Sequence, residues 1–194
     1  MSANGVEFGL HGSRKSHNDP AQLRQEKEAL AAVTDDPVLG VRQHYHQLDK
    51  VPTKTFEAQA AAGFVYDSTF VPQSFGLERI FQPFEAVTSM TEIPVSFADR
   101  DYGSLVREYD VETVWNRIEA VLEQYRRNDG VCCVSWHPHA FYDDENLAHR
   151  LFYNHFEGFS ELYERILEYG AEYGARMCPC RDVVDRQRDK TARW

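Results

Sequence analysis

The sequence lacks any long apolar run, because charged or strongly polar residues interrupt every hydrophobic stretch. A membrane-spanning helix needs about 20 consecutive, mostly apolar residues. The first residues also lack a basic segment followed by an apolar one, the pattern of a secretory signal. We therefore expect a soluble, cytoplasmic protein with no membrane partner.

Lysine is also scarce, with only 5 residues, and no run of basic residues is present. The formal net charge is -10 at pH 7. Such a chain has no basic surface to neutralise phosphates, so this balance argues against a nucleic acid or an anionic membrane as its partner.

Cysteine pairs with the two-residue spacing of zinc ribbons and thioredoxin-like sites are missing. Cys132 and Cys133 are adjacent, and a single proline separates Cys178 from Cys180. We expect buried, reduced thiols. The alternative, thiol redox chemistry at Cys178 and Cys180, needs a reactive thiolate that no neighbouring residue obviously provides.

The 194 residues, 42% of them hydrophobic, suffice for one domain with a sizeable core, so we expect a single domain over 1–194. Apolar patterning predicts strands alternating with helices, which favours an α/β fold with a parallel sheet. Residues 69–91 lack a clear period and read as an irregular loop with room for one short strand. The expected strands are 6–10, 38–41, 64–68, 92–97, 131–136 and 176–178. The expected helices are 20–33, 53–62, one capped by Asp110 and closed at 128–130, 156–173, and a terminal one from 181.

Histidines follow three of the expected strands, in segments 9–13, 41–46 and 135–139. The carboxyl ends of parallel barrel strands converge on one face, so these strand ends predict one shared site. Imidazole and carboxylate ligands would suit a divalent metal in a hydrolase. Asp67 and Asp99 also end strands, where a carboxylate serves either a site or a turn.

Five motifs in this order resemble the polysaccharide deacetylases of the NodB-homology type, and the likeness covers nearly the whole chain. The motifs are residues 9–13, residues 40–45, residues 63–69, residues 93–95 followed by Asp99, and residues 136–138.

This resemblance implies a distorted (β/α) barrel and a divalent metal, usually zinc, that hydrolyses N- or O-acetyl groups of a carbohydrate substrate. His11 matches the first histidine of the metal motif, and Arg42 matches the arginine that orients the catalytic base. Asp99 matches the acid of the fourth motif. His137 matches the histidine that acts as general acid.

The chain departs from the family at the metal motif. Lys15 stands where the family has its second metal histidine, four residues after His11. His17, His44 or His46 could replace that ligand, and His44 is our assignment.

A second departure lies upstream, because no aspartate pair precedes His11 to supply the family's base and one metal ligand. We expect a barrel incomplete at the N-terminus, with an open sheet edge that favours self-association. We also expect little deacetylase activity unless Asp19, Asp67 or Asp99 replaces the base. The alternative is an inactive or truncated deacetylase-like domain, either a fragment or a barrel completed by another chain.

Overall fold

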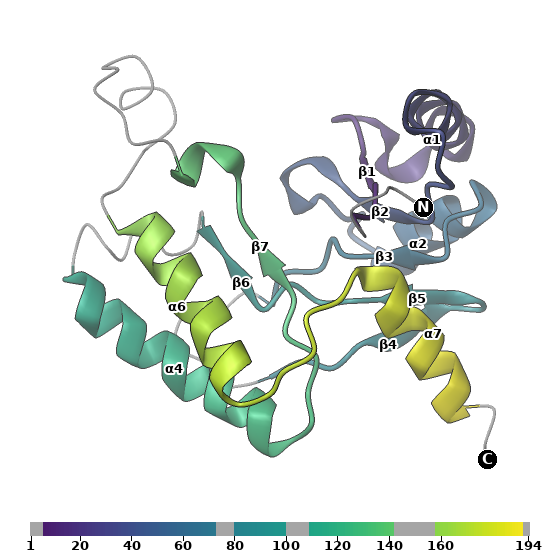
Figure 1. Cartoon of the computed structure of the whole chain (residues 1–194). Coiled ribbons are helices and arrows are strands. Elements are labelled where there is room, and N and C mark those ends of the chain that lie inside the picture. Colours follow the sequence, from purple (N-terminus) through teal and green to yellow (C-terminus); the bar gives the residue numbers. More distant parts are fainter. Residues whose placement is uncertain (1–5, 73–79, 100–108, 142–157, 192–194) are drawn as a thin grey trace, which may run out of the picture. The chain divides into compact units, whose positions relative to one another are not determined.

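The computed structural model describes residues 6–72, 80–99, 109–141 and 158–191 (Figure 1). Contacts divide the chain into two compact units. Unit 1 comprises Met1–Pro72, Gln82–Pro94 and Cys178–Trp194, and unit 2 comprises Gln73–Phe81 and Val95–Met177. The expectation of a single catalytic domain stays a prediction. In the described part of the chain, no helix combines the length and apolar character needed to cross a membrane.

Unit 1 contains a five-stranded sheet in the order β1-β2-β3-β5-β4. The first four strands in this order run parallel, and only β4 is antiparallel to its neighbour. The α/β class is therefore confirmed, and β1 is an edge strand among the described residues. The strands are β1 (Leu10–His11), β2 (Gly40–Arg42), β3 (Tyr66–Asp67), β4 (Phe84–Val87) and β5 (Met90–Glu92).

Unit 1 has an apolar core and three of the described helices. They are α1 (Pro20–Thr34), α2 (Pro52–Ala61) and α7 (Cys180–Thr191), with 3-10 turns η1 (Ser16–Asn18) and η2 (His44–His46). α7 lies beside β4 and β5 (Figure 1). The Arg188 guanidinium of α7 donates to the Ser89 carbonyl in the turn between these strands. The buried core residues are Leu10, Leu23, Val38, Val41, Ala58, Ala62, Phe64 and Met90.

Local signals set the limits of α1 and α2 as predicted. Asp19 Oδ1 accepts hydrogen bonds from the backbone N–H groups of Ala21 and Gln22, which caps α1. Gly63 follows α2 with φ 86°, the left-handed conformation that glycine adopts without strain.

Gly40 opens β2 because no side chain fits there. A Cβ atom at this position would lie 1.9 Å from the ring of Tyr66, the residue beside Gly40 in the parallel register of β2 and β3. The Tyr66 ring therefore packs over the Gly40 backbone and fixes the close approach of β2 and β3.

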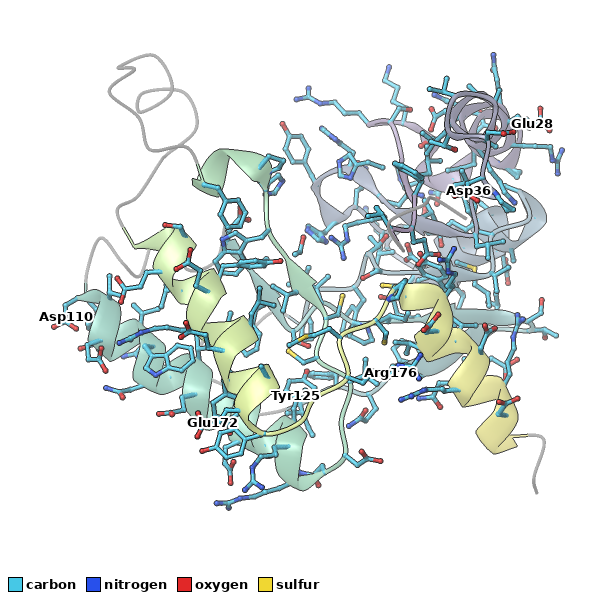
Figure 2. The ribbon with its side chains drawn as sticks, viewed as in Figure 1. Glu28, Asp36, Asp110, Tyr125, Glu172 and Arg176 are labelled. Carbon is cyan, nitrogen blue, oxygen red and sulfur yellow. The ribbon has the colours of Figure 1, made fainter. Side chains whose placement is uncertain are left out.

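Unit 2 joins a short parallel pair of strands to two helices that lie side by side (Figure 1). Asp110 caps the first helix at its N-terminal end, where its Oδ1 accepts the Thr113 N–H at 2.6 Å (Figure 2). The strands are β6 (Phe97–Ala98) and β7 (Val134–Ser135), and the helices are α4 (Val111–Arg127), α6 (Phe159–Glu172) and the 3-10 turn η3 (Pro138–Phe141). The buried core residues are Phe97, Val114, Ile118, Leu122, Leu162 and Ile166.

Three expectations for the strands are wrong. The single strand expected over 92–97 is split between β5 and β6, with Pro94, which has no N–H to donate, between them. The region expected to be irregular with room for one strand carries two, β4 and β5, in a hairpin. Residues 176–178 form no strand, and Met177 is 56% exposed, so no apolar burial holds this segment in a sheet.

Candidate functional site

His11 and His44 approach each other at the carboxyl ends of neighbouring strands. His11 is the last residue of β1 and pairs in register with Arg42, two residues before His44. The 3-10 turn η2 follows β2 directly and brings the His44 ring to His11. His11 Nε2 and His44 Nδ1 lie 3.0 Å apart, with the two rings at 70°.

This nitrogen separation fits two neighbouring ligands of one divalent ion. Zinc–nitrogen bonds are about 2.0–2.1 Å, so adjacent ligands in tetrahedral or octahedral geometry lie roughly 2.9–3.4 Å apart. Neutral imidazole nitrogens are also the donor type that zinc prefers. Within the described ranges, however, no group of three or more His, Cys, Asp or Glu residues could hold a metal. The histidine pair would supply two of the three protein ligands usual in a catalytic zinc site.

Of the three alternatives for the partner of His11, the structure brings His44 to it. His46 Nδ1 lies 3.1 Å from the Thr69 carbonyl oxygen. His17 Nε2 lies 3.4 Å from Gln47 Nε2, on the 3-10 turn η1. The assignment of the metal to His11 and His44 stays a prediction, but the two side chains do meet as it requires.

Arg14 and Tyr45 lie against the histidine pair. Arg14 Nη2 donates to the Tyr45 hydroxyl at 2.8 Å, and its Nε lies 3.5 Å from His44 Nε2. Tyr45 and His46 both have φ 55°, a left-handed backbone that is costly for residues with a side chain. Backbone strain of this kind accumulates at functional sites. Arg14 was not among the candidate residues from the sequence.

Arg42 is the last residue of β2, and its side chain binds Ser68, directly after β3. Its Nε donates to the Ser68 carbonyl at 2.8 Å, and its Nη2 donates to the Ser68 hydroxyl at 2.9 Å. The Ser68 hydroxyl in turn donates to the Ile93 carbonyl. Arg42 thereby ties the ends of β2, β3 and β5 together, and the expectation that it orients a carboxylate base stays a prediction.

Two acids lie buried at the same end of the sheet. Asp67 and Glu92 are register partners on β3 and β5, and both have 0% exposure. Burial raises the pKa of Asp67 to about 6, while hydrogen bonds from Glu92, Thr69 and nearby backbone N–H groups oppose that rise. Asp67 was a candidate from the sequence. Glu92 was missed, because it stands at the start of a predicted strand with no sign that it would be buried.

In unit 2 the structure brings together Asp99 and His137, which were separate candidates from the sequence. His137 Nδ1 lies 2.9 Å from Asp99 Oδ1, and the His137 backbone N–H donates to Asp99 Oδ2 at 2.8 Å. The Asp99 side chain is 3% exposed, whereas the His137 side chain is 54% exposed. A carboxylate in this place favours the tautomer with Nδ1–H, in which Nε2 is the nitrogen that accepts or returns a proton. That His137 shares one site with His11 stays a prediction.

His149 and His155 lie outside the described residues. None of the four cysteines forms a disulfide, but only Cys133 is buried, so the expectation of buried thiols is wrong for Cys132, Cys178 and Cys180, which are partly exposed. Desolvation raises the pKa of Cys132 to about 12. A thiol with so high a pKa carries almost no thiolate at neutral pH, which argues against redox chemistry at that residue.

The fold and these side-chain arrangements define an α/β protein with strand-end histidines in unit 1 and an Asp–His pair in unit 2. Neither a family model nor a curated protein matches the sequence. The likeness to the polysaccharide deacetylases accordingly remains a resemblance in five motifs.

Proposed function

We propose that the chain is a metal-dependent hydrolase that removes N- or O-acetyl groups from a carbohydrate. The observation that carries this proposal is the 3.0 Å approach of His11 Nε2 to His44 Nδ1 at the carboxyl ends of parallel strands. Two imidazoles from segments 33 residues apart meet nitrogen to nitrogen, as ligands of one ion do.

In this proposal His11 and His44 hold the metal, with zinc as the ion that best suits two imidazoles. A bound divalent ion supplies a water of lowered pKa and polarises the acetyl carbonyl. Arg42 keeps the carboxyl ends of β2 and β3 in register, so it positions the segment from which His44 projects.

His137 is the general acid of the proposed reaction. Asp99 fixes the ring by accepting from both the backbone N–H and the ring Nδ1, and it stabilises the imidazolium once formed. The half-exposed ring can then give its Nε2 proton to the leaving amine or alkoxide. Asp99 thus positions His137 and need not touch the substrate itself.

The resemblance in five motifs supports the acetylated carbohydrate as substrate and a distorted (β/α) barrel as the complete fold. The parallel order of β1, β2, β3 and β5 is compatible with part of such a barrel.

A second candidate is a non-catalytic relative that keeps the fold and binds the carbohydrate without cleaving it. Lys15 favours this reading, because an ammonium group stands where the resembled family has its second metal histidine. A cation at that place would oppose a bound metal rather than hold it.

Acetate release from acetylated sugar oligomers, with zinc or cobalt added, separates the two candidates. The hydrolase proposal expects turnover, which is small unless another aspartate replaces the missing base, and which is lost in His137→Ala and kept in His17→Ala, a matched histidine outside the pair. Binding of the sugar oligomers without acetate release in the unmodified chain would favour the non-catalytic relative. Turnover that is independent of added metal and of His137 would contradict the proposed mechanism.

A further inference from the structure

Two acidic side chains lie next to each other in the interior of the unit 1 sheet. Asp67 on β3 and Glu92 on β5 are register partners in a parallel pair, which places both side chains on the same face. Both are fully buried. Two carboxylates so placed cannot both carry charge in a dry environment, because repulsion adds to the loss of hydration.

One oxygen of each acid accepts a hydrogen bond from a neighbouring group. Asp67 Oδ1 accepts from the Thr69 hydroxyl at 2.5 Å, and Glu92 Oε1 accepts from the Phe70 N–H at 3.0 Å. Asp67 Oδ2 is buried and receives no hydrogen bond from an N–H or hydroxyl group in the described part of the chain. A proton lying between this oxygen and Glu92 would satisfy it.

We propose that Asp67 and Glu92 share one proton in the folded protein, and that this proton makes the strand-end region of unit 1 sensitive to pH. The pair is then a carboxylic acid bonded to a carboxylate, with the remaining charge held by Thr69 and Phe70. No redox step or added cofactor is needed.

The pair is connected to the candidate site through residues 68–70, here called the 68–70 strap. On one side the strap binds the acids, through Thr69 and Phe70. On the other side the Thr69 hydroxyl accepts the backbone N–H of Gln43, the residue directly before His44.

Two ionisable groups from neighbouring elements also face the strap. Arg42 from β2 binds Ser68, and His46 from η2 approaches the Thr69 carbonyl. The charged residues of α2, Lys54 and Glu57, are exposed. Losing the shared proton would therefore loosen a segment on which Arg42, Gln43 and His46 all depend.

The sign of the pH effect follows from the direction of the pKa change. The folded-state pKa of Asp67 is raised, from 3.8 to about 6, mainly by burial. The stabilisation is therefore complete below pH 4 and is lost as the pH rises through about 6. The unfolding midpoint should fall by roughly 5 °C between pH 5 and pH 7.5 through this pair alone.

Carbon-13 spectra of the side-chain carboxyl groups of the full chain, recorded from pH 3 to pH 8, test the proposal directly. We expect the pair to lose its shared proton near pH 6 and the other carboxyl group to be ionised already at a clearly lower pH. Ordinary titration of both groups near pH 4 would overturn the proposal, whatever any variant does.

Glu92→Gln provides the matched variant, because its amide can donate to Asp67 without a titrating proton. We expect the fall of the unfolding midpoint between pH 5 and pH 7.5 to be lost in Glu92→Gln and kept in Glu57→Gln, an exposed control. Unchanged pH dependence in Glu92→Gln would contradict the proposal.

Discussion

Asp99 accepts hydrogen bonds from two groups of one residue, the backbone N–H of His137 at 2.8 Å and its ring Nδ1 at 2.9 Å. The first bond fixes the strand end and the second fixes the ring. A buried carboxylate that accepts from both the backbone and the ring of a more exposed histidine orients the proton on that ring.

Asp99→Asn should therefore disturb the ring of His137 while leaving the fold intact. An amide can present its NH₂ group to Nδ1 and so favour the wrong tautomer. We expect the rate of acetate release to fall about 10²- to 10⁴-fold, with little change in KM. Nitrogen-15 spectra of labelled histidine should show His137 protonated at Nδ1 in the unmodified chain and altered in the variant.

Asp110→Asn is the matched control for this experiment, since asparagine caps a helix about as well as aspartate. Its rate and its His137 spectrum should equal those of the unmodified chain. Equal losses in both variants would show that Asp99 has no particular role.

Gly40→Ala should destabilise unit 1 because the new methyl group would overlap the Tyr66 ring. Overpacking in a closed site costs about 1–3 kcal/mol, and the 1.9 Å approach places this change at the upper end or beyond. Denaturant unfolding would measure the loss. Gly9→Ala is the control, because its nearest contact would be an ordinary 3.5 Å, and it should change stability by less than about 1 kcal/mol. Equal stabilities of the two variants would refute the packing argument.

Much of the fold follows from local signals in the sequence. The caps at Asp19 and Asp110 predicted the starts of α1 and α4, because a capping side chain acts within three residues of itself. The β4–β5 hairpin was missed because its strands lack clear alternation and depend on pairing across the sheet. The division of residues 92–97 between β5 and β6 was missed for a related reason, since tertiary contacts determine which strands pair.

The contacts of the candidate site were likewise predicted only in part. Strand-end positions predicted that His11 would meet His44, since side chains at adjacent parallel strand ends lie close together. Asp99 and His137 were each candidates from the sequence, but their direct contact was not predicted. The burial of Glu92 beside Asp67 needs the register of β3 and β5, which no local pattern specifies.

Calorimetric titration of the metal-free chain with zinc tests the central claim most directly. We predict one zinc ion per chain, with affinity reduced at least about tenfold in His11→Ala and in His44→Ala and unchanged in His17→Ala. Binding far below one ion per chain, or binding unaffected by His11→Ala, would show that the 3.0 Å contact between the two rings is a hydrogen bond with no metal-binding role.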